Sequence, residues 1–168
     1  MLKLEFFLID TSPKTVLEFY NNINRIPLSI SIGNYSSMPT SIYCRNFDDR
    51  NFIDLWFEKN TAVLYEIVII GLHKDSVINI ESVLNVDNKQ YYTCRIIEED
   101  SELTNSLTVK VLRTNQSVQL IFDNADISEL KYFQIGMNVY LGIDMNNFLK
   151  SIFVDNLSAS NIYDIFGF

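Results

Sequence analysis

The chain has few of the residues on which most catalytic and metal-binding sites depend. Its 168 residues include one histidine, two cysteines and five glycines. His73 has no second histidine with which to hold a metal, and Cys44 and Cys94 do not have the spacing of zinc ligands. The glycines form no phosphate-binding loop, and no nucleophile elbow is present. We therefore expect no cofactor, no bound metal and no enzymatic activity, although the fold could still assemble a triad or a carboxylate pair.

Basic residues are also in short supply. Lys and Arg number 13 against 21 Asp and Glu, so the formal net charge is −8. Binding to nucleic acid depends largely on Lys and Arg that release phosphate counterions, so nucleic acid is not expected as a ligand. An anionic membrane surface is disfavoured for the same reason. A basic protein is the natural electrostatic complement, while the alternative that the acidity only serves solubility stays open.

Long apolar runs are missing as well. The longest, Thr61–Leu72, is interrupted by Glu66 and is shorter than the ~20 residues that span a bilayer. The N-terminal segment contains Lys3 and Glu5 and lacks the apolar core and cleavage site of a signal peptide. We expect a cytoplasmic protein in which Cys44 and Cys94 are reduced thiols that pack in the core.

Apolar and aromatic residues are abundant in this chain. Hydrophobic residues make up 48% of it, with twelve Phe and nine Tyr. This composition is typical of a folded chain rather than a disordered one. The length fits one domain, so residues 1–168 are predicted to form a single domain that needs no metal or disulfide.

The pattern of apolar residues predicts both strands and helices. Alternation or β-branching predicts strands at 2–9, 28–32, 41–46, 61–72, 91–96, 107–112, 118–122 and 137–143. Helical spacing predicts helices that begin at Ser12, Asp48 and Asp144, and a short last helix over 160–168. Residues 73–76 resemble a turn, and residues 76–86 fit either a strand or a helix, with β-branching in favour of a strand.

These elements predict an α+β fold. The connections between the central strands are too short for parallel crossovers, so the strands should form one antiparallel meander. The helices fall near the N- and C-terminal parts of the chain.

Acidic residues gather in three segments, two of them beside predicted strands and one at a predicted helix start. Together with nearby tyrosines, such segments are typical of an interface for a basic protein, although charged residues more often form an ordinary solvated face. The candidate partner-binding residues are Glu98, Glu99, Asp100, Glu102, Asp123, Asp126, Glu129, Asp48 and Asp49.

In general character the chain resembles the bacterial immunity proteins that accompany contact-dependent growth-inhibition toxins and other polymorphic toxins. The resemblance lies in the opening strand, the helix start at Asp10-Thr11-Ser12-Pro13 and the aromatic helix that follows. It covers the whole chain and assigns no role to any single residue. It implies a one-to-one inhibitor of a toxin domain, commonly a basic nuclease, which acidic residues would attract and an aromatic contact would hold.

Two other hypotheses remain open at this point. The chain could be a structural or accessory subunit of a phage or another bacterial assembly, which homo-oligomerisation in solution would favour. It could also be a metal-dependent enzyme that uses scattered carboxylates. Thermal stabilisation by Mg²⁺, Mn²⁺ or Ca²⁺ would favour the enzyme, because a ligand that binds only the native state stabilises it.

Overall fold

Two β-sheets dominate the computed structural model, which describes residues 2–20, 27–33, 41–47, 51–82, 86, 90–99 and 108–167. Among the described residues, strands account for 57% and helical segments for 10%. No helix among these residues combines the length and the apolar character needed to cross a bilayer. The predicted α+β class is therefore wrong, and the fold is mostly β.

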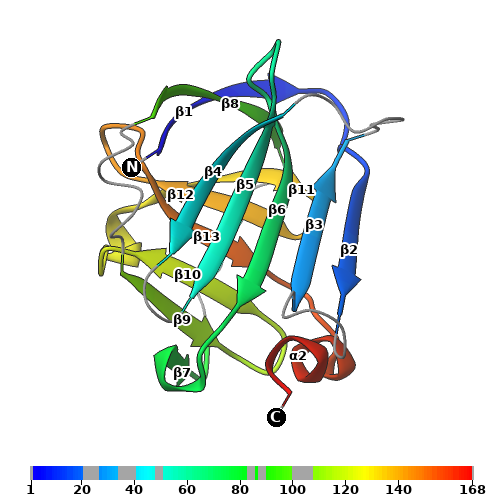
Figure 1. The fold of residues 1–168 in the computed structure, drawn as a ribbon, viewed down its shortest axis with the longest axis vertical. Coiled ribbons are helices and arrows are strands. Elements are labelled where there is room, and N and C mark those ends of the chain that lie inside the picture. Colours follow the sequence, from blue (N-terminus) through cyan, green and yellow to red (C-terminus); the bar gives the residue numbers. More distant parts are fainter. Residues whose placement is uncertain are drawn as a thin grey trace.

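The large sheet has eight strands and the small sheet has five. In spatial order, the large sheet consists of β1 (Leu2–Ile9), β8 (Tyr91–Glu99), β11 (Lys131–Gly136), β12 (Val139–Ile143), β13 (Leu149–Val154), β10 (Val118–Phe122), β9 (Val109–Arg113) and β7 (Val77–Asn79). The small sheet consists of β2 (Thr15–Phe19), β3 (Leu28–Ile32), β6 (Leu64–Gly71), β5 (Phe52–Glu58) and β4 (Ser41–Phe47). Three short helical segments complete the described elements: η1 (Lys74–Ser76), η2 (Ile127–Glu129) and α2 (Ala159–Phe166). The small sheet lies in front of the large one in Figure 1, and the strands of the two sheets cross.

Three of the four predicted helices are strands. The segments expected to be helical after Ser12, Asp48 and Asp144 form β2, β5 and β13. In β5, Ile53 and Phe57 are fully buried, whereas Phe52 on the opposite face is exposed. Because apolar residues occupy both faces of such a strand, their spacing coincides with that of a helical stripe, and periodicity alone cannot separate the two.

Asp144 begins a tight turn rather than a helix. Its carboxylate accepts hydrogen bonds from the backbone N–H groups of Asn146, at 2.9 Å, and Phe148, at 3.0 Å. Asn147 has a positive φ of 66°, which an α-helix does not allow. The turn leads into β13, which continues back along the large sheet beside β12.

The other predicted elements agree better with the structure. The strand positions at 2–9, 28–32 and 118–122 are confirmed, as are the final helix and the turn at 73–76. Residues 77–79 form a strand, which answers the strand-or-helix question for that part of 76–86, whereas residues 83–85 lie outside the described residues. The predicted single meander is wrong, because β8 pairs with β11 and β7 with β9 in parallel, and β11 was not predicted.

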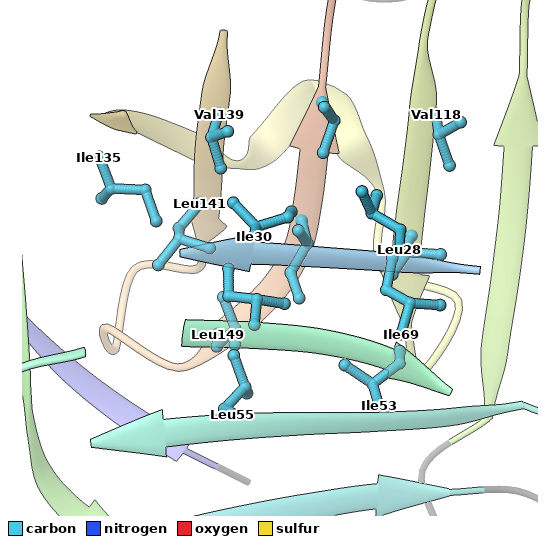
Figure 2. Packing of buried hydrophobic residues seen from close by; sticks show 14 of the residues in the cluster. Leu28, Ile30, Ile53, Leu55, Ile69, Val118, Ile135, Val139, Leu141 and Leu149 are labelled. Atoms are coloured by element: carbon cyan, nitrogen blue, oxygen red, sulfur yellow. The ribbon is translucent and has the colours of Figure 1, made fainter. Parts of the chain in front are cut away.

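The core lies between the two sheets. Figure 2 shows side chains of β3, β5 and β6 opposite side chains of β10, β11, β12 and β13. Those labelled are Leu28, Ile30, Ile53, Leu55 and Ile69 from the small sheet and Val118, Ile135, Val139, Leu141 and Leu149 from the large one, all at most 5% exposed. They belong to one cluster that also includes Ile162, Ile165 and Phe166 of α2. Burial of this area is the main favourable contribution to folding, at about 25 cal/mol per Å² of apolar surface.

The large sheet also buries polar side chains. The amide nitrogen of Gln119 donates to the Tyr132 hydroxyl at 2.7 Å and to the Ser151 hydroxyl at 3.0 Å. Gly142 lies in register with both Tyr132 and Ser151. A Cβ atom at Gly142 would lie 2.8 Å from the Tyr132 ring and 3.0 Å from the Ser151 Cβ. Only glycine allows these two side chains to meet Gln119 at this point.

We predict that Gly142→Ala lowers the free energy of unfolding by about 1–3 kcal/mol, because the new methyl group overpacks this cluster. Gly71→Ala is the matched control, since a Cβ there would meet nothing within 4 Å. Urea denaturation of both variants measures the effect. Equal changes in the two variants would contradict the packing argument.

Candidate functional site

Six of the nine predicted partner-binding residues have side chains outside the described part of the chain. Asp48, Asp49, Asp100 and Glu102 belong to segments that the structure does not describe. Glu98 and Glu99 are the last residues of β8, where they lie in register with Lys3 and Leu2. Their part in binding stays a prediction.

The remaining three, Asp123, Asp126 and Glu129, lie on the connection between β10 and β11. Asp123 Oδ2 is 3.5 Å from the Nζ atom of Lys150. Asp126 is the N-cap of η2, and its carboxylate accepts hydrogen bonds from the Ser128 N–H at 2.9 Å and the Ser128 hydroxyl at 2.6 Å. These hydrogen bonds lower the pKa of Asp126 below its ordinary value of 3.8. Two of the three predicted acids therefore already interact with their own chain.

A second acidic surface, not predicted from the sequence, lies on the outer face of the small sheet. Leu17, Ile30, Leu55 and Ile67 point into the core, so the residues that alternate with them point away from it. Strand pairing arranges these residues in two neighbouring rows across β2, β3, β6 and β5. We call them the outer face of the small sheet: Glu18, Ser29, Val68 and Asp54 in one row, and Val16, Ser31, Glu66 and Trp56 in the other.

Two carboxylates of this outer face, Glu18 and Glu66, reach the solvent, whereas Asp54 in the same rows is buried at 3% exposed. The Ser29 hydroxyl donates to Glu66 Oε1 at 2.8 Å, across the two rows. The Tyr20 hydroxyl, just beyond the end of β2, donates to Glu18 Oε2 at 2.8 Å. This hydrogen bond, with burial and the negative charges of Glu18 and Glu66, raises the pKa of Tyr20.

Basic residues are scarce in the small sheet. None of its strands β2, β3, β5 and β6 contains Lys or Arg. Arg45 on β4 is in register with Asp54, which is 3% exposed. Glu18, at the β2 edge of this face, therefore has no Lys or Arg neighbour from β2, β3, β5 or β6.

Aromatic side chains accompany the carboxylates. Trp56 is the only tryptophan of the chain and is partly exposed in register with Glu66. Tyr20 is 39% exposed and Phe52 is 37% exposed. Figure 1 shows the small sheet on the near side of the molecule, with no described helix or strand drawn in front of it. A rigid face with acidic and aromatic groups is suited to binding a basic protein surface.

Because helices were predicted for β2 and β5, this face was not recognised from the sequence. A helix over 12–24 or after Asp48 places Glu18 and Asp54 on unrelated solvated surfaces. In the structure, Val16, Glu18 and Tyr20 are two residues apart along the edge strand β2. Asp54 and Trp56 are likewise two residues apart on β5, inside the sheet. The period of two in these segments was the available signal.

The histidine and one cysteine lie where the sequence placed them. His73 is exposed at the turn before η1, where its Nδ1 atom is 3.5 Å from Asp75 Oδ2. Cys94 is 2% exposed in the core, and burial strongly raises the pKa of its thiol. The predicted packing role is confirmed for Cys94, whereas the side chain of Cys44 lies outside the described residues. Within the described part of the chain, no group of His, Cys, Asp or Glu is placed to hold a metal ion.

The comparison with known proteins assigns no family. No protein-family model matches the chain, and no curated protein matches its sequence significantly. Functional inference therefore depends on the geometry of the surfaces described above.

We predict that Ser128→Ala raises the pKa of Asp126 toward 3.8, because the Ser128 hydroxyl is the largest cause of its lowering. A carboxylate whose pKa is lowered by folding stabilises the native state at pH values above its pKa in the unfolded chain. This contribution is lost as the pH falls through its pKa in the folded protein. An NMR titration of the Asp126 carboxyl carbon measures the shift. Ser12→Ala, which removes an exposed serine whose hydroxyl bonds Pro13, is the control and should leave this pKa unchanged.

Proposed function

We propose that the chain is a cytoplasmic immunity-type protein that binds a basic toxin domain in a 1:1 complex and neutralises it. The single observation that best supports this proposal is the outer face of the small sheet. It combines Glu18 and Glu66 with Trp56 and Tyr20 on strands that core packing holds in place. The general resemblance of the sequence to toxin immunity proteins agrees with it.

The charges and the aromatic groups have separate roles in this proposal. Carboxylates at the rim of a surface mainly raise the rate of encounter with a basic partner and make that rate dependent on salt. Partly exposed aromatic side chains supply the contact area that slows dissociation. Trp56 and Glu66 lie in register, so an aromatic group and a carboxylate are neighbours at one point of the face.

The outer face of the small sheet is a better candidate than the β10–β11 connection. On that connection, Asp126 is held by Ser128 and Asp123 lies near Lys150. A partner would have to compete with these interactions. At the outer face, Glu18 is exposed at the end of a row and accepts a hydrogen bond from the neutral Tyr20 hydroxyl.

Co-production with the toxin domain encoded beside this chain tests the function. Cells that make the toxin should grow when the chain is present and stop growing when it is absent. Size-exclusion chromatography with light scattering should show a 1:1 complex that high salt weakens. If no neighbouring toxin is neutralised and no complex forms, the proposal is wrong.

Charge reversal separates the two acidic surfaces. We predict that Glu18→Lys slows association with the toxin domain by about tenfold at low salt, without a change in thermal stability. Glu129→Lys is the matched control, because Glu129 is equally a surface glutamate but lies on the β10–β11 connection. Stopped-flow fluorescence of Trp56 measures both rates. The reverse result, with Glu129 sensitive and Glu18 not, would place the interface on the connection.

A further inference from the structure

Strand β2 is an edge strand whose outer side has unpaired backbone groups. It pairs with β3 on one side only. The Gly33 N–H donates to the Lys14 carbonyl at 2.8 Å, one position before Thr15 and Ile32, which lie in register. Because hydrogen-bonded pairs alternate along an antiparallel ladder, Val16 and Glu18 bond β3. The N–H and C=O groups of Leu17 therefore point away from β3, to the open side of the sheet.

Among the described elements, α2 contacts β2, but no described backbone group forms a hydrogen bond to the middle of this edge. The backbone hydrogen bonds of the described residues include none to the outer side of Leu17. At the start of the strand, the Thr15 hydroxyl accepts a bond from the Met137 N–H at 3.0 Å, which leaves the middle of β2 free. The large sheet differs, since the Leu4 N–H of its edge strand β1 donates to the Asn147 carbonyl.

The edge also lacks the features that usually prevent strand addition. Natural edge strands are protected by lysine, proline or a β-bulge. The sequence of β2, Thr15–Phe19, contains neither lysine nor proline, and its pairing with β3 has no shift of register. A strand with these properties is able to accept another strand through its backbone.

We propose that an extended segment of the basic partner adds to the small sheet along β2, with alternating basic and apolar side chains. This inference depends on the proposed function and names the contact that the partner makes. Side chains on one face of the added strand would lie beside Glu18 and Tyr20, where a basic group is complementary. Those on the other face would lie beside Leu17 and Phe19, which pack against the core and favour apolar neighbours.

A second copy of this chain is a less suitable occupant. Each copy has a formal charge of −8. Pairing two β2 strands would extend one acidic outer face into another, and the like charges would repel each other. A basic segment has the opposite sign and adds no such repulsion.

The test uses two synthetic peptides of about nine residues, long enough to cover β2. One alternates Lys and Val, and the other alternates Glu and Val. Amide hydrogen exchange at Leu17 is followed by NMR in the full chain, with Ile30 on the inner strand β3 as an internal reference. At low salt, the Lys peptide should slow exchange at Leu17 by about tenfold or more, because the amide gains a hydrogen-bond partner. The Glu peptide should have no effect.

The isosteric variant Glu18→Gln provides the charge control. It keeps the shape of the side chain and removes its charge, so binding of the Lys peptide should weaken by about tenfold at low salt while Ile30 exchange stays unchanged.

Each of the other results would overturn the inference. A change in Trp56 fluorescence without protection of Leu17 would show that the peptide binds the face and not the edge, which leaves the proposed function intact. Protection of Leu17 that rises with protein concentration alone would identify a second copy as the occupant. Failure of the Lys peptide to bind would remove the edge as a contact, whereas failure of the function itself would appear separately in the growth assay.

Discussion

The burial of one apolar face of each sheet against the other is the interaction on which this structure depends. Ile30 on the inner strand β3 of the small sheet and Leu141 of the large sheet are both 0% exposed. This packing fixes the inward side of β2, β3, β5 and β6 of the small sheet, and alternation then fixes their outward side. The position of Glu18, Glu66 and Trp56 on one surface is therefore a consequence of what the other side of the same strands buries.

The sequence was sufficient for the strands whose residues alternate or are β-branched, and for the last helix. Leu28–Ile32 and Val118–Phe122 were predicted with their observed bounds. It was insufficient for β5 and β13, because strands with apolar residues on both faces have the spacing of a helical stripe. The candidate site shows the same limit. Its rows join β2, β3, β5 and β6 by long-range pairing, and no local pattern specifies which strands are neighbours.

The acidic composition and the sheet architecture support one another in the proposed function. Charge alone is compatible with simple solubility. The structure adds that two carboxylates, Glu18 and Glu66, share a face with the only tryptophan, and that an open backbone edge borders that face. These three properties act at different stages of binding. The negative charge speeds the approach of the partner, the aromatic contact area slows its dissociation, and backbone pairing aligns it with β2.

The order of the strands along the chain has a consequence for how the protein folds during synthesis. The small sheet is built from a continuous stretch, residues 15–71, so its strands can pair as soon as they leave the ribosome. The large sheet begins with Leu2, whose partner is Glu99. This long loop must close before the pair forms, which is slow for contacts so distant in sequence. The first strand to be synthesised, β1, is therefore among the last to pair within its sheet.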